Sequence, residues 1–236
     1  MKKLSRGFGL VEIMVALVLG LVVSLGIVQI FLASRGTFVS QNASARMQED
    51  ARFVLSKMLQ ELRMTGMYGC LQFDAAPVSG AINKPTALNN PILWDAANRT
   101  LTLVTADVGT SGTSPTWTIL SNCQDSSQLY EGARTPATGQ TAFPLRQLIY
   151  KVSGTELQLQ LPGGQPQSLL QNVAGFDIQF GMAGSPMTYS QAANSITNGN
   201  GPDVLSVRIT LQMSDPSARV RNQTFTAVAY LRNRFL

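Results

Sequence analysis

Histidine is absent from the 236-residue sequence, so the most common general base and the most common metal ligand are both missing. Catalysis would then depend on carboxylates, lysine, serine or cysteine, and the acidic residues form no close group outside the segment QED at 48–50. The sequence also contains no glycine-rich phosphate-binding loop and no zinc-ligand spacing. We therefore predict that the chain is not an enzyme and that it needs no cofactor or metal.

Charge is also scarce, because charged residues make up 13% of the chain, about half of the usual share. The formal net charge of +5 could indicate a nucleic-acid partner. However, Lys2, Lys3 and Arg6 all precede an apolar run, and the other basic residues are scattered until Arg232 and Arg234. We therefore expect no nucleic acid among the partners.

Only two cysteines are present, Cys70 and Cys123, and their spacing excludes a CxxC redox or zinc motif. In an oxidising compartment they would form one disulfide, worth roughly 3–5 kcal/mol of stability in the chain-entropy model. Two buried free thiols are the alternative. We favour the disulfide because the charge pattern described next places both residues outside the cytoplasm.

The longest stretch without charge lies near the amino terminus, between Glu12 and Arg35. Its residues 13–34 are numerous enough to span a bilayer as a helix, and the basic residues before them favour a cytoplasmic amino terminus. A cleaved secretory signal fits poorly, because the run is too long and no small-residue cleavage site follows. A plain anchor would leave Glu12 unexplained, since an ionisable group at that depth is costly and usually functional.

The segment RGFGLVEIMVALVLG, residues 6–20, resembles the class III signal of type IV pilins and their relatives. The resemblance implies that prepilin peptidase cleaves after Gly7, that Phe8 becomes the methylated first residue, and that Glu12 is the fifth residue of the mature chain. It also implies a single-pass protein of the bacterial inner membrane with a periplasmic globular domain, which later enters a pilus on the cell surface. Residues 1–7 would be the leader peptide and residues 8–34 the transmembrane and assembly helix.

Cleavage would give Phe8 a charged amine, which is as costly in lipid as the carboxylate of Glu12. Two adjacent helices shifted along their axes could pair the amine of one with Glu12 of the other, so we predict that Glu12 docks a neighbouring subunit. The alternative is a carboxylate that reaches back to the cytoplasmic interface. Ala16, Gly20 and Ser24 recur every four residues and form a ridge of small side chains suited to close helix packing.

Helical periodicity continues through residues 35–69, which predicts an amphipathic continuation of the helix. Charged residues at i,i+4 spacing, Arg46–Asp50 and Lys57–Glu61, are expected to lie off the apolar face. That face consists of Met47, Ala51, Val54, Leu55, Met58 and Leu62.

The stretch QEDARFVLSKMLQELRMTGMYGC, residues 48–70, ends the helix at Gly66 and resembles the PilW type of minor pilin. The match recurs in GFDIQFG and in the closing YLRNRFL, and Cys70 matches the cysteine of that family. The resemblance implies a minor pilin that joins other minor pilins and the major pilin to prime type IV pilus assembly, with a large adhesin at the tip. A J-type pseudopilin of a type II secretion system, or a pilin that binds DNA or another ligand, is the alternative.

Residues 70–236 are predicted to form a β-rich globular domain, because Thr, Ser, Gly and Pro separate its short apolar runs. Strands are expected at 99–108, 116–123, 176–180, 205–213 and 225–231, with a hairpin at 148–164. One antiparallel sheet packed on the helix would give a pilin-like α+β fold. The polar segment 184–202 is expected to be a long loop for a partner or surface contact. Asp203 is expected to be a turn residue rather than a calcium ligand.

Overall fold

The computed structural model describes residues 9–70, 78–107, 114–191, 195–196 and 204–231. The predicted cleavage residues Gly7 and Phe8, the predicted turn residue Asp203 and most of the closing YLRNRFL segment lie outside the described residues. The chain forms two compact units, Met1–Arg46 and Met47–Leu236, and each is described by itself.

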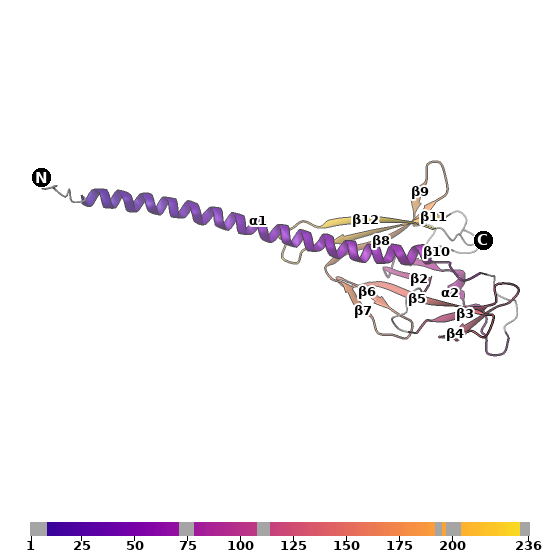
Figure 1. The fold of residues 1–236 in the computed structure, drawn as a ribbon. Coiled ribbons are helices and arrows are strands. Elements are labelled where there is room, and N and C mark those ends of the chain that lie inside the picture. Colours follow the sequence, from indigo (N-terminus) through magenta and orange to yellow (C-terminus); the bar gives the residue numbers. More distant parts are fainter. Residues whose placement is uncertain (1–8, 71–77, 108–113, 192–194, 197–203, 232–236) are drawn as a thin grey trace. The chain divides into compact units, whose positions relative to one another are not determined.

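A single helix, α1 (Leu10–Met64), begins in the first unit and ends in the second (Figure 1). The carbonyl oxygen of Gly9 closes its first turn by accepting hydrogen bonds from the amides of Glu12 and Ile13 at 3.0 and 3.2 Å. No proline interrupts the helix. It ends where the sequence predicted, because Gly66 adopts a φ of 83° that a continuing α-helix cannot use.

Within the second unit, α1 buries the predicted apolar face, which is therefore confirmed. Its buried apolar residues are Met47, Ala51, Val54, Leu55, Met58 and Leu62. One of the two i,i+4 pairs named from the sequence forms an ion pair, with 2.7 Å between Lys57 Nζ and Glu61 Oε1. The expectation that Glu61 lies off the buried face is wrong: Glu61 is buried because Tyr150 of the sheet provides a hydrogen-bond partner inside the unit.

The second unit holds two antiparallel sheets, not the single sheet that was expected. The larger sheet has the spatial order β10, β1, β2, β5, β3, β4, with β6 on β5 and β7 beyond β6. β5 is the longest of these strands because it pairs with β3 along its first part and with β6 along its last part. The bounds are β1 (Ile92–Asp95), β2 (Thr100–Ala106), β3 (Trp117–Ser121), β4 (Ser127–Glu131), β5 (Thr141–Ser153), β6 (Glu156–Gln160), β7 (Gln167–Leu170) and β10 (Ser195–Ile196).

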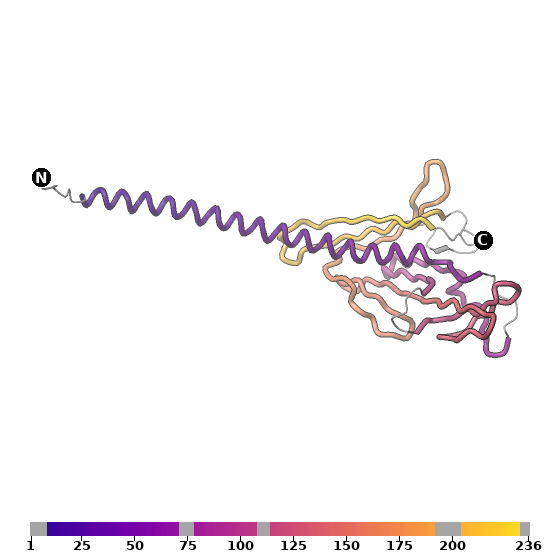
Figure 2. The backbone as a smooth tube through the Cα atoms, in the orientation of Figure 1, coloured from indigo at the N-terminus to yellow at the C-terminus, as the bar shows by residue number. Residues whose placement is uncertain are grey.

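The smaller sheet has the order β12, β11, β8, β9. Alternating apolar residues of β8 and β11 are buried, as their period-two pattern predicted. In the second unit, the end of α1 and the strand β12, which are far apart in sequence, line one groove and follow neighbouring paths (Figure 2). The bounds are β8 (Val173–Met182), β9 (Thr188–Ser190), β11 (Val204–Met213) and β12 (Gln223–Tyr230).

One hydrophobic core joins the buried face of α1 to both sheets. The sheets meet where Trp94 of β1 and Phe176 of β8 pack edge to face, with ring centroids 5.5 Å apart. A smaller core lies under the short helix α2 (Thr86–Asn89) and includes Leu88, Trp117 and Leu145.

Segment 184–202 is not one uninterrupted loop, which corrects the sequence-based expectation. It contains β9, which extends the smaller sheet, and β10, which pairs with β1 of the larger sheet. The sequence also missed β1, β4, β7 and α2, each of which has only four or five residues.

Candidate assembly interface

The first unit exposes an apolar helix surface. Every residue from Gly9 to Phe38 is exposed, and the large apolar side chains from Leu10 to Leu32 have exposed fractions of 53–76%. Among the described residues, α1 is the one helix long and apolar enough to cross a membrane. A helix that is apolar on all sides needs lipid or other protein around it, so this surface is the candidate interface.

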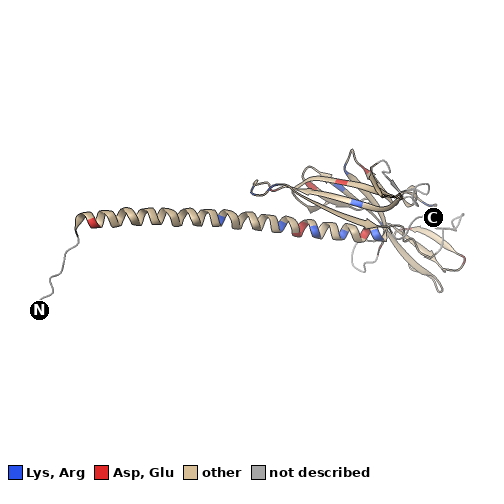
Figure 3. Cartoon of the chain, turned by 90° about the horizontal axis from the view of Figure 1, so that it is seen from above, with Lys and Arg blue, Asp and Glu red and all other residues tan. Residues whose placement is uncertain are grey.

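Glu12 is the only charged residue between Gly9 and Arg35, and Figure 3 shows the long stretch of α1 that follows it up to Arg35 without Lys, Arg, Asp or Glu. It lies in the first turn of the helix, where a carboxylate interacts favourably with the helix dipole by about 0.3–1 kcal/mol. Among the residues that the structure describes, no basic side chain lies within ion-pair distance of Glu12. The described residues therefore supply only a weak local stabilisation for this carboxylate.

The predicted small-residue ridge of Ala16, Gly20 and Ser24 lies on exposed helix. A methyl group added to Gly20 would meet no atom within 4 Å. The space beside this ridge is therefore open in the single chain, as a surface for another helix requires.

Comparison with known families bears on this same segment. Residues 2–28 match the family model described as the prokaryotic N-terminal methylation motif. The chain carries the methylation motif of the type IV pilin and pseudopilin superfamily. No curated protein matches the sequence.

The motif implies processing by prepilin peptidase. Together with the apolar helix, it indicates a protein that resides in the inner membrane before it enters a pilus or pseudopilus. Proteins of this superfamily are structural rather than enzymatic. The matched segment contains every predicted cleavage, methylation, docking and ridge residue, and the individual roles of these residues stay predictions.

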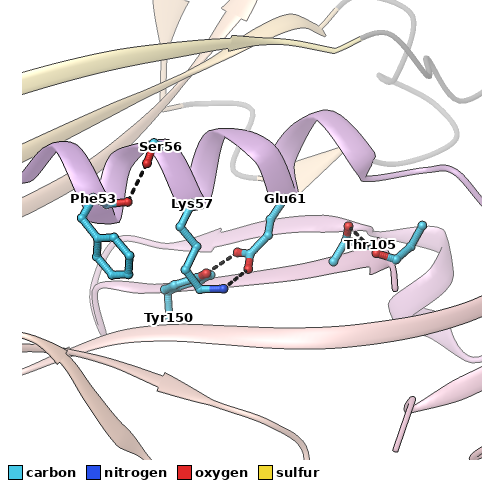
Figure 4. A network of polar contacts seen from close by, with 7 residues as sticks. Phe53, Ser56, Lys57, Glu61, Thr105 and Tyr150 are labelled. Carbon is cyan, nitrogen blue, oxygen red and sulfur yellow. Dashed lines mark hydrogen bonds and ion pairs between the residues drawn. The ribbon is translucent and has the colours of Figure 1, made fainter. Parts of the chain in front are cut away.

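A buried polar network fixes the end of α1 to the larger sheet in the second unit (Figure 4). Glu61, only 8% exposed, accepts hydrogen bonds from the Tyr150 hydroxyl of β5 and from Lys57 one turn earlier on α1. Burial, and after it the Glu61 carboxylate, raises the pKa of Tyr150 well above its usual value. One turn further on, Thr65 bridges to Thr105 of β2, so the end of the helix is fixed to the larger sheet.

Sequence reasoning missed this network. The i,i+4 spacing gave the pair of Lys57 and Glu61, but it gave no sign that the carboxylate is buried. Tyr150 follows Glu61 by 89 residues, so only the fold brings the two side chains together.

A cavity of about 500 Å³ opens beside this network. Four charged residues line it, and they form two ion pairs: Lys57 with Glu61 at 2.7 Å and Arg146 with Asp107 at 2.9 Å. Among the described residues, no group of three or more His, Cys, Asp or Glu could hold a metal ion. All four of these charges are therefore paired within the wall of the cavity.

The segment after α1 is fixed by the predicted disulfide between Cys70 and Cys123, whose Cα atoms are 5.4 Å apart. The bond ties the end of the helical segment to the turn between β3 and β4. Gly69 must be glycine, because its φ is 118° and a Cβ would lie 3.1 Å from the ring of Phe143.

Proposed function

We propose that this chain is a minor pilin of the PilW type, which assembles with other minor pilins to prime a type IV pilus and stays at its tip. In this proposal residues 1–7 are the leader, 8–34 the transmembrane and assembly helix, 35–69 its amphipathic continuation, and 70–236 the periplasmic domain. The QEDARF to MYGC stretch that resembles this type supports the assignment. The partners are prepilin peptidase, the other minor pilins, the major pilin and a large tip adhesin.

The assembly step follows from charge in a medium that solvates it poorly. Cleavage after Gly7 creates an ammonium group on Phe8, and methylation leaves that nitrogen positively charged. A neighbouring helix displaced along the axis brings its Glu12 to this ammonium, and the two charges neutralise each other in a charge-assisted hydrogen bond. Ala16, Gly20 and Ser24 let the two backbones approach closely.

The observation that carries the proposal is the carboxylate of Glu12, which has no ion-pair partner among the described residues and stands at the start of an exposed apolar helix surface. A snorkelling carboxylate would need no neighbour. The docking role therefore predicts that assembly depends on the negative charge of Glu12.

The test compares Glu12→Ala and Glu12→Gln with the wild type. We expect all three to lose the seven-residue leader, read as the mature mass, because the scissile bond at Gly7 is unchanged. Both variants should enter sheared pili at least about tenfold less, since the ion pair is missing in each. Wild-type incorporation of Glu12→Gln would contradict docking.

A second variant tests the cleavage site itself. Gly7→Phe should block processing, so the protein should keep the mass of the full chain and remain in the inner membrane.

A strain that lacks this protein distinguishes the two kinds of filament. Normal pili together with loss of protein secretion in that strain would assign the chain to a secretion pseudopilus instead.

A further inference from the structure

We propose that the open edge of β12, with the groove between β12 and α1, is a docking site for one extended strand of another protein. The strand would be acidic at the end beside the start of β12 and apolar at alternate positions. This inference rests on the second unit alone and does not depend on the proposed function.

At every second residue of β12, the backbone N–H and C=O point away from β11, toward the free side of the strand. β12 pairs with β11 in an unbroken antiparallel register, and the Leu231 amide donates to the Leu205 carbonyl at 3.0 Å. Because hydrogen-bonded and non-hydrogen-bonded pairs alternate, every second residue of β12 directs its N–H and C=O outward. These outward residues are Thr224, Thr226, Val228 and Tyr230. Only β11 pairs with β12, so the other edge of β12 is open within the part of the chain that the structure describes.

This edge lacks the devices that usually prevent strand addition. The sequence QTFTAVAY has no charge and no proline, and its eight residues pair without a bulge. The other edges are shorter or covered: β9 has three residues, and on β4 the Leu129 carbonyl accepts the Ile82 amide. A long, regular and unprotected edge is the usual receptor for an added strand.

The groove beside β12 determines which side chains fit on the face of the added strand that lies toward α1. It holds about 440 Å³ and is lined by Leu55 and Leu59 of α1 and by Phe225 of β12, among others. Side chains directly opposite one another on adjacent strands share a face of the sheet. The residues of the new strand opposite Phe225 and Ala227 would therefore lie over the two leucines, and apolar side chains fit there.

Charge sets the chemistry of one end of the incoming strand, the end beside the start of β12. Arg52 lines the groove, is exposed, and forms no ion pair within the described part of the chain. Arg221, also exposed, stands two residues before β12. Carboxylates on the incoming strand complement both cations. A second copy of this chain fits less well, because its own β12 carries no carboxylate.

The test uses the full chain in detergent micelles and a fluorescein-labelled peptide, Glu-Val-Thr-Val-Thr-Val-Thr-Glu. Alternate amides of the peptide are N-methylated so that it offers only one hydrogen-bonding edge. We expect saturable binding in fluorescence anisotropy. Thr226→Pro should weaken binding about tenfold or more, because it removes an outward N–H. The fold should survive, since the Thr226 amide makes no bond to β11.

Thr226→Ala is the matched control, because it removes the side chain and keeps the amide, and its binding should stay within about twofold of the wild type. A charge swap tests the site without any backbone change: a peptide with lysine at both ends should bind poorly to the wild type and better to Arg52→Glu. Equal binding by a folded Thr226→Pro, or no binding of the acidic peptide, would overturn the proposal. A dimer of the chain that Thr226→Pro dissociates would assign the edge to a second copy instead.

Discussion

At the scale of single residues, Glu61 shows how much depends on a partner that the sequence does not reveal. A carboxylate inside a protein is costly unless hydrogen bonds or an opposite charge compensate it. Lys57 on the same helix supplies the charge, and Tyr150 on β5 supplies the second hydrogen bond. Local spacing predicted the first contact, and only tertiary structure could give the second.

Tyr150→Phe should lower the free energy of unfolding by about 2 kcal/mol, because it removes a hydrogen bond to a buried charged group and leaves the apolar ring in place. The measurement is urea unfolding of the full chain in detergent, followed by tryptophan fluorescence, since Trp94 belongs to the same core. Tyr230→Phe is the control. Tyr230 is exposed, so its change should stay within about 0.5 kcal/mol.

The same pair predicts a dependence on alkaline pH. The pKa of Tyr150 is raised in the folded state, first by burial and then by Glu61. The protonated Tyr150 hydroxyl therefore stabilises the fold fully below about pH 10, which is the pKa of tyrosine in the unfolded chain. This stabilisation is lost as the pH rises above that value. The stability difference between the wild type and Tyr150→Phe should shrink above that pH. A difference that stayed constant up to pH 12 would contradict this account.

At the scale of elements, strong periodicity made prediction possible. α1 kept one apolar face up to Gly66, and β8 and β11 alternated cleanly, because each buries one side against a single core. β3 was also found, although all five of its residues are buried. Its apolar and β-branched residues were a sufficient signal without alternation.

The missed elements are short, and their positions depend on distant partners. β1 pairs with β10, about a hundred residues later, and β10 lies in a polar stretch that reads as a loop. The division into two sheets follows from the same pairings. Trp94 and Phe176 meet between the sheets, and no local pattern could have shown this contact.

The disulfide is a covalent link between the segment after α1 and the turn between β3 and β4. Cys70 and Cys123 are 53 residues apart, so the chain-entropy model gives about 4 kcal/mol of stabilisation. The double variant Cys70→Ser with Cys123→Ser should lose about this much in urea unfolding. Reduced wild-type protein should unfold like the double variant. If oxidised and reduced wild type unfold at the same urea concentration, the bond does not stabilise the unit.

At the scale of the whole molecule, the two units differ in what the sequence could reveal. The candidate assembly surface was predictable, because residues 9–38 are all exposed and the residue pattern is itself the surface. The edge of β12 was not predictable, because openness is a property of sheet order. The strand was expected from its alternation, but its place at the end of the order β12, β11, β8, β9 comes only from the fold.

The small-residue ridge gives a prediction with an internal control. Gly20 and Gly26 both have open space where a Cβ would lie, so leucine at either position should leave the single chain folded and should raise helix propensity by about 0.8 kcal/mol. Gly26 lies about 120° around the helix from Gly20, away from Ala16 and Ser24. If the ridge packs against a neighbouring subunit, Gly20→Leu should enter sheared pili about tenfold less than Gly26→Leu, measured by quantitative immunoblot against the membrane fraction. Equal incorporation of the two variants would show that the ridge is not the helix contact, and a loss confined to Gly26→Leu would place that contact on the face that holds Gly26.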